Sequence, residues 1–231
     1  MRVGIFSDIH GNIGAFDRVW KALLNESCDM YFCVGDLCGY YYAQNEVIEA
    51  VQHIDGLVCV LGNHDQLFLE CLEDGKKLKE YSSKYGGSLS FLKDTITPGH
   101  LEYLRGLPLF YENKELGLAM YHGSPWNALN EYIYPTDPAD RFKGLDHKYV
   151  LLGHTHHPMH KRIGNVQIIN PGSVGQPRDH SQAAFAVLDL DKDAVSFKRV
   201  SYDIGLLVED LKRRDEKNVY LFDVLKRKKS G

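Results

Sequence analysis

Five short motifs combine aspartate, asparagine and histidine side chains, and each follows a run of apolar residues. They are Asp8-Ile9-His10, Gly35-Asp36, Gly62-Asn63-His64-Asp65, His122-Gly123 and Gly153-His154-Thr155-His156. Each motif alone arises readily by chance. Loops at the carboxyl ends of strands in α/β sheets converge on one ligand-binding edge. Five such motifs in one chain therefore predict a single shared metal site.

The side chains of these motifs suit two divalent metal ions. Ions held about 3.5–4 Å apart need a shared ligand, and a carboxylate can bridge them while imidazoles and an amide oxygen complete each shell. Asp36 is the natural bridge. Carboxylate, amide and imidazole ligands without a thiolate favour Mn, Fe, Co, Ni or Zn over Cu(I) or Ca. Manganese is our first choice among them, although the residues do not select one metal. A net positive centre of this kind attracts an anionic phosphate and lowers the pKa of bound water.

The elements that position these motifs alternate between strands and helices in the first half of the chain. Apolar runs predict strands at 2–6, 30–34, 57–61, 116–121 and 149–152, and helical spacing predicts helices at 13–24 and 46–53. Such alternation is typical of parallel α/β layers.

The rest of the chain contains other patterns. Residues 66–105 have no strand signal and predict a helical excursion, which could form a partial lid. After His160 we expect antiparallel hairpins, one around Gly164-Asn165 and one between 183–190 and 194–200. A helix is predicted at 204–213, and the basic end at 226–229 reads as a frayed tail. With no repeat or long linker, we predict one domain over residues 1–231, built from two packed sheets flanked by helices.

Composition restricts the class of protein. The chain has 231 residues, of which 44% are hydrophobic and 25% charged, as in ordinary globular proteins. Its formal charge of −4 disfavours duplex nucleic acid as a partner. No apolar run reaches the roughly 20 residues that span a bilayer, so no membrane partner and a cytoplasmic location are expected. Five cysteines without a Cys-x-x-Cys pair are expected to be reduced thiols.

Taken in order, the motifs resemble the calcineurin-like metallophosphoesterase superfamily. Longer matches extend the resemblance across nearly the whole chain, at 7–12, 122–125, 153–158 and 170–178. They look most like its small bacterial and archaeal single-domain phosphodiesterase branch. The resemblance implies an α/β fold, a four-layer α/β/β/α sandwich of two mixed sheets flanked by helices.

The resemblance also implies roles for individual residues. One metal would be held by Asp8, His10, Asp36 and His156, and the other by Asp36, Asn63, His122 and His154. His64 would be the catalytic residue that is not a ligand, stabilising charge on the phosphate or protonating the leaving oxygen. An imidazole suits this task because its unperturbed pKa is about 6.5.

The chain departs from the superfamily pattern after Asp36. Protein phosphatases carry Asp-Arg-Gly there, whereas this chain reads Leu37-Cys38-Gly39 followed by three tyrosines at 40–42. Without that aspartate, His64 has no obvious orienting partner, and without that arginine one phosphate clamp is missing. Protein phosphatase activity is therefore disfavoured. The tyrosines either offer rings for base stacking or support the loop.

Four further residues are candidate substrate contacts: Asn12, Tyr40, Trp126 and Arg178. A guanidinium matches phosphate bidentately, but Arg178 could equally form a structural pair with Asp179 or with another carboxylate. Trp126 either lines the pocket or packs under the loop that begins at Pro125.

The expected function is hydrolysis of a phosphodiester through in-line attack by a metal-bridging hydroxide, on a small phosphate ester or nucleotide. Alternatives within enzymes are a dinucleoside polyphosphate hydrolase and a phosphomonoesterase or protein phosphatase. The remote alternative is a non-catalytic scaffold of the same fold. The oligomeric state cannot be read from the residues.

Overall fold

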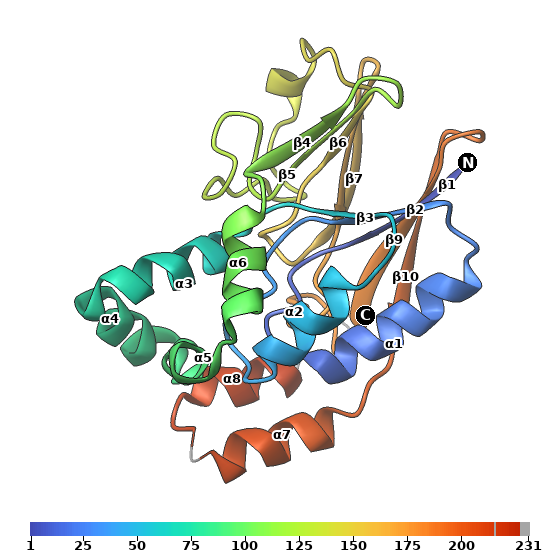
Figure 1. Ribbon diagram of the computed structural model, residues 1–231. Coiled ribbons are helices and arrows are strands. Elements are labelled where there is room, and N and C mark those ends of the chain that lie inside the picture. Colours follow the sequence, from blue (N-terminus) through green and yellow to red (C-terminus); the bar gives the residue numbers. More distant parts are fainter. Residues whose placement is uncertain (215, 227–231) are drawn as a thin grey trace.

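Two five-stranded mixed sheets form the centre of the computed structural model, which describes residues 1–214 and 216–226 (Figure 1). Sheet A has the strand order β10-β9-β1-β2-β3. Its strands are β1 (Arg2–Phe6), β2 (Met30–Cys33), β3 (Leu57–Cys59), β9 (Ala183–Asp189) and β10 (Ala194–Val200). β1, β2 and β3 run parallel, β9 pairs antiparallel with β1, and β10 pairs antiparallel with β9.

Sheet B has the order β4-β5-β6-β8-β7. Its strands are β4 (Phe110–Asn113), β5 (Leu118–Tyr121), β6 (Tyr149–Leu151), β7 (Pro158–Ile163) and β8 (Val166–Pro171). The two expected hairpins are present, β7 with β8 and β9 with β10. The expectation of an antiparallel second half was nevertheless wrong for the centre of sheet B, where β5, β6 and β8 pair in parallel. Hairpin signals describe only neighbouring strands, so they say nothing of such long-range pairing.

The described ranges contain eight α-helices. They are α1 (Ile13–Asn25), α2 (Gln44–Gln52), α3 (Asn63–Glu73), α4 (Gly75–Tyr85), α5 (Ser88–Thr95), α6 (Pro98–Gly106), α7 (Ile204–Arg213) and α8 (Val219–Asp223). The region for which a helical excursion was predicted contains α3 to α6, with Thr97 capping α6 and Asp74 capping α4. The predicted helix at 204–213 coincides with α7.

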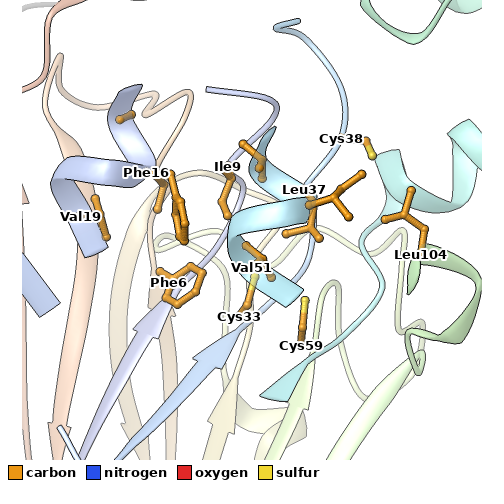
Figure 2. Packing of buried hydrophobic residues seen from close by; sticks show 14 of the residues in the cluster. Phe6, Ile9, Phe16, Val19, Cys33, Leu37, Cys38, Val51, Cys59 and Leu104 are labelled. Atoms are coloured by element: carbon orange, nitrogen blue, oxygen red, sulfur yellow. The ribbon is translucent and has the colours of Figure 1, made fainter. Parts of the chain in front are cut away.

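Side chains alternate between the two faces of each strand and build three layers of core. Val3, Ile5 and Met120 belong to the core between the sheets, whereas Phe6 and Cys33 face the helices (Figure 2). The segment after β5 covers the outer face of sheet B. It contributes Ile133 and also Phe142, which belongs to the short 3-10 turn η1 (Asp140–Phe142). Two mixed sheets flanked by helices confirm the predicted α/β class.

The last described element is a second 3-10 turn, η2 (Val224–Lys226), and residues 227–229 of the basic end lie outside the described residues. In the part of the chain that is described, no helix combines the length and apolar character needed to cross a bilayer.

Candidate metal centre

The five motifs meet at one edge of the two sheets. Asp8 and His10 follow β1, Asp36 follows β2, and Asn63 and His64 open α3 after β3. His122 follows β5, and His154 and His156 follow β6, so sheet B supplies the other half of the site. All these strands are parallel to a neighbour, and the site lies at their carboxyl ends.

One cluster consists of Asp8, His10, Asp36 and His156, whose potential ligand atoms all lie within 4.8 Å of one another. The Nε2 atoms of His10 and His156 are 3.0 Å apart. The distance from His156 Nε2 to Asp8 Oδ1 is 3.3 Å, and from His10 Nε2 to Asp36 Oδ2 it is 3.6 Å.

A second cluster consists of Asp36, His122 and His154, again within 4.8 Å of one another. His122 Nε2 lies 3.4 Å from Asp36 Oδ2 and 2.9 Å from the amide oxygen of Asn63. Asp36 belongs to both clusters, so its carboxylate can serve two ions. The structure thus brings together all seven side chains that the resemblance assigned to metals.

Backbone carbonyls orient three of the four histidines. Nδ1 of His10 lies 2.8 Å from the carbonyl oxygen of Cys38, Nδ1 of His122 lies 2.7 Å from that of Val34, and Nδ1 of His156 lies 2.6 Å from that of Gln176. A carbonyl only accepts, so each Nδ1 carries the proton and donates it. In a neutral ring Nε2 then presents a lone pair to the centre, which is the arrangement of histidines that bind metals.

Several buried polar atoms of the site have no hydrogen-bond partner in the described part of the chain. Asp8 Oδ1, Asp36 Oδ2 and His154 Nε2 are in this position, and the lone pairs of His10 and His156 face each other. Buried acceptors directed at one another without a donor are costly. A divalent cation would satisfy them, so the residues present fit the metals that the motifs predict.

The electrostatics of the centre agree with this fit. Burial opposes ionisation of Asp36, but the facing imidazoles of His122 and His64 outweigh it and hold the pKa of Asp36 well below its usual range. Burial likewise lowers the pKa of His122, yet the carboxylate of Asp36 outweighs it and raises that pKa to about 10. The buried carboxylates therefore require positive charge beside them.

The backbone of the ligand loops adopts an uncommon conformation. Asp8, His10, Asp36, His154 and His156 all have φ between 52° and 66°. Residues other than glycine rarely occupy this left-handed region, and such strain persists only where the surroundings impose it.

Asp65 supplies that constraint for the loop that carries Asp36. Its buried carboxylate accepts hydrogen bonds from the backbone N–H groups of Asp36, Leu37, Cys38 and Gly62, at 2.8 to 3.3 Å. Only glycine fits at position 62, where the backbone lies close to Asp36, because a Cβ there would lie 2.1 Å from Asp36 Oδ1. The motif contained Asp65, but sequence reasoning gave it no role.

His64 lies beside the clusters at the start of α3. Its backbone N–H donates to Asp36 Oδ1 at 2.8 Å, so the amino end of the helix supports the bridging carboxylate. Burial lowers the pKa of the His64 ring to about 4. Its Nδ1 lies 3.3 Å from the hydroxyl oxygen of Tyr81.

A cavity of about 450 Å³ opens over the clusters. Its lining includes the ligand side chains Asp36, Asn63, His154 and His156 together with His64. The remaining walls are tyrosines and two cations: Tyr40, Tyr85, Tyr132, Tyr220, Lys84 and Arg178. Tyr132 stacks on His154 with ring centroids 3.8 Å apart.

Two of the four candidate substrate contacts, Tyr40 and Arg178, line this cavity, and the other two do not. Asn12 is buried and caps α1, its amide oxygen accepting from Ala15 N–H and its amide nitrogen donating to the Gly175 carbonyl. Its polar atoms are thus already engaged within the protein. In this structure Asn12 is the cap of α1 and lies outside the cavity lining.

For Trp126, Tyr41 and Tyr42, the contacts in the structure agree with the packing alternatives. The Trp126 ring packs edge-on against Phe142, and the guanidinium of Arg141 lies 3.5 Å from its centroid. It supports the outer layer of sheet B and is absent from the cavity lining. Tyr41 and Tyr42 pack into a core with helices α7 and α8, so they support the loop.

The carboxylate of Asp179, which the sequence offered as a partner of Arg178, binds Arg199. Sequence reasoning missed Lys84, Tyr85, Tyr132 and Tyr220 as cavity residues. Tyr85 lies in the predicted helical excursion, which gave it no role in the site, and nothing local marks Tyr132 or Tyr220 as neighbours of the metal motifs.

Comparison with known proteins identifies the family. Residues 1–193 match the calcineurin-like phosphoesterase superfamily domain, so the chain belongs to that superfamily and is a phosphoester hydrolase with a site for two divalent metals. An uncharacterised protein of Methanocaldococcus jannaschii is 32% identical over 229 residues, which cover 90% of this chain and 91% of that protein.

Solved structures agree over the whole length. A metallophosphoesterase from Sphaerobacter thermophilus is 27% identical, with a TM-score of 0.82 over 97% of this chain and 98% of that one. A hypothetical protein from Pyrococcus horikoshii OT3 has a TM-score of 0.85 at 23% identity, covering 97% of each chain, which shows a shared fold.

Proposed function

We propose that this protein is a metal-dependent phosphodiesterase that acts on small substrates. The observation that carries the proposal is the pair of ligand clusters that share Asp36 beneath a tyrosine-walled cavity. A scaffold has no use for buried carboxylates and imidazoles that lack partners, so the site favours an enzyme over a non-catalytic member of the same fold.

The metals supply Lewis acidity and a water of lowered pKa when they are bound. Asp8, His10, Asp36 and His156 would hold one ion, and Asp36, Asn63, His122 and His154 the other. The donor set suits manganese, our first choice, as well as iron, zinc, nickel or cobalt.

Other residues bind and orient the substrate. Arg178 lines the cavity, and its permanently charged guanidinium can hold phosphate oxygens in two parallel hydrogen bonds. His64 lines the same cavity and can donate to the leaving oxygen from the ring nitrogen that Tyr81 does not contact. The surrounding tyrosine rings reduce access of bulk water to the phosphate.

The preference for diesters follows from charge and from space. A monoester dianion carries about one more negative charge than a diester and gains most from an extra cationic clamp. This chain has Leu37-Cys38-Gly39 where protein phosphatases carry that clamp, so Arg178 is the guanidinium left to hold the phosphate. A diester needs room for a second substituent, and the rings of Tyr85, Tyr132 and Tyr220 offer apolar surface for one, such as a nucleoside.

A substrate panel tests this proposal on metal-reconstituted protein. We would measure kcat/KM for bis-p-nitrophenyl phosphate, p-nitrophenyl phosphate, a 2′,3′-cyclic nucleotide and a dinucleoside tetraphosphate with saturating manganese. The diesters should be preferred, and chelation should abolish turnover. A monoester preference of about tenfold, roughly 1.4 kcal/mol in transition-state stabilisation, would overturn the diesterase assignment. Equal rates with and without metal would overturn the metal-dependent mechanism.

A further inference from the structure

The ring of His64 needs a partner that fixes its direction and its tautomer. An imidazole donates from one nitrogen reliably only when the other nitrogen is held by a hydrogen bond. Across residues 1–214 and 216–226, His64 forms no ion pair with a carboxylate, and its Nδ1 faces the hydroxyl of Tyr81 at 3.3 Å.

Tyr81 is a buried residue that lies beside His64. It lies in α4 on the same helical stripe as Leu78 and Tyr85, and only 3% of its surface is exposed. Its ring meets the His64 ring edge-on, with centroids 5.9 Å apart, and packs against Tyr85 at 4.9 Å. The position of the His64 ring also depends on Gly39, because a Cβ there would lie 2.6 Å from His64 Nδ1.

The Tyr81 hydroxyl is placed so that it can donate its proton to His64. The hydroxyl oxygen of Tyr81 accepts from the backbone N–H of Tyr40 at 3.3 Å. Its own proton is then available for His64 Nδ1. An Nδ1 that accepts leaves the His64 proton on Nε2. Tyr81 is not part of the cavity lining, whereas His64 is.

We propose that Tyr81 is the positioning residue of His64, holding it as the Nε2–H tautomer directed into the cavity. The proposal deepens the phosphodiesterase function proposed above and rests on it. A residue of the helical excursion thereby replaces the acidic partner that the sequence lacks after Asp36.

The test is Tyr81→Phe in the full-length protein, which removes the hydroxyl and keeps the ring. Tyr42→Phe is the matched control, because it removes another buried hydroxyl that binds Glu216 at 2.6 Å, away from His64. Both variants would be reconstituted with manganese and checked for metal content.

For a diester with an alkoxide leaving group, such as a 2′,3′-cyclic nucleotide, Tyr81→Phe should lower kcat about tenfold or more, as loss of an orienting partner does elsewhere. KM and metal content should be unchanged. The loss should be much smaller for bis-p-nitrophenyl phosphate, because the weakly basic nitrophenolate needs little stabilisation from the Nε2–H donor. Tyr42→Phe should show no such dependence on the leaving group. Equal losses for both leaving groups would overturn the proposal.

A second readout does not depend on activity. Nitrogen-15 NMR of the metal-free protein, with His64 assigned by its absence in His64→Asn, should report the Nε2–H tautomer in the wild type and a mixture of tautomers in Tyr81→Phe. An unchanged tautomer would overturn the proposed contact. If the wild type hydrolyses no phosphate ester, the proposed function fails, while this spectrum still decides whether Tyr81 holds His64.

Discussion

Asp36 is the side chain on which both ligand clusters depend. We expect Asp36→Asn to reduce metal content at both positions and to lower kcat/KM by more than 100-fold, beyond the 10–100-fold typical of outer partners. His156→Ala removes a ligand from one cluster only, so its loss should be smaller. Elemental analysis and kinetics on both variants check this, and a greater loss in His156→Ala would contradict the bridging role.

His64 differs from the ligands because it belongs to neither cluster. His64→Asn should therefore keep its metals while turnover falls, by about 10²–10⁴-fold for an alkoxide leaving group if the ring donates a proton. The effect on bis-p-nitrophenyl phosphate should be small. Elemental analysis of His64→Asn and its kcat for both esters test this expectation. Equal losses would assign His64 to binding or charge stabilisation.

At the scale of elements, the start of α3 holds the ligand loop after β2 in place. The carboxylate of Asp65, at the start of α3, accepts hydrogen bonds from the backbone N–H groups of the loop after β2. The same helix start directs the N–H of His64 at Asp36. The precision of the site therefore depends on the junction between β3 and α3.

The opposite end of the molecule has a polar link between the two sheets. Asp193, in the turn between β9 and β10, binds Lys148, Tyr149 and Arg162 of sheet B and the loop before it, at 2.6 to 2.8 Å. The hydrogen bonds from Lys148 and Tyr149 lower the pKa of Asp193. A carboxyl whose pKa is lowered by folding stabilises the fold above its unfolded pKa of about 3.9, and that contribution is lost as the pH falls further.

Asp193→Asn should therefore lower the stability at pH 7 by about 1 kcal/mol, which is about 2–4 °C in Tm for a chain of this size. The difference from the wild type should shrink as the pH falls from about 5 to 2. Thermal unfolding followed by circular dichroism checks this. Lys192→Gln is the control in the same turn, since its side chain is 78% exposed and its effect should stay below about 2 °C. A pH-independent difference would count against the charged link.

For the whole molecule, the metal centre joins the two sheets, because Asp8, His10 and Asp36 come from sheet A and His122, His154 and His156 from sheet B. Metal binding should consequently stabilise the entire fold. A free ion concentration about 100-fold above Kd contributes about 2.7 kcal/mol per site, or roughly 5–10 °C in Tm. A manganese titration followed by thermal unfolding measures the shift. The shift should be largely lost in Asp36→Asn, and an equal shift in that variant would place the bound manganese elsewhere.

Much of the centre could be predicted from the residues alone. Each ligand follows directly on a short apolar run, so the strands β1, β2, β3, β5 and β6 and the chemistry at their ends are visible locally. The helix at 204–213 and the hairpin of β9 with β10 were equally evident from spacing and turn residues. Local propensity and hydrophobic period act over a few residues, which is the range in which these signals lie.

Only the tertiary structure decided what surrounds the metals. Tyr132 reaches the cavity from the segment after β5 and Tyr220 from α8, 88 positions later in the chain, whereas Asn12 and Trp126 turn out to support the fold. The partner of His64 likewise comes from α4, which packs against the loop after β2. Side-chain packing between elements that are distant in sequence determines these neighbours. Short sequence spacings carry no information about such packing.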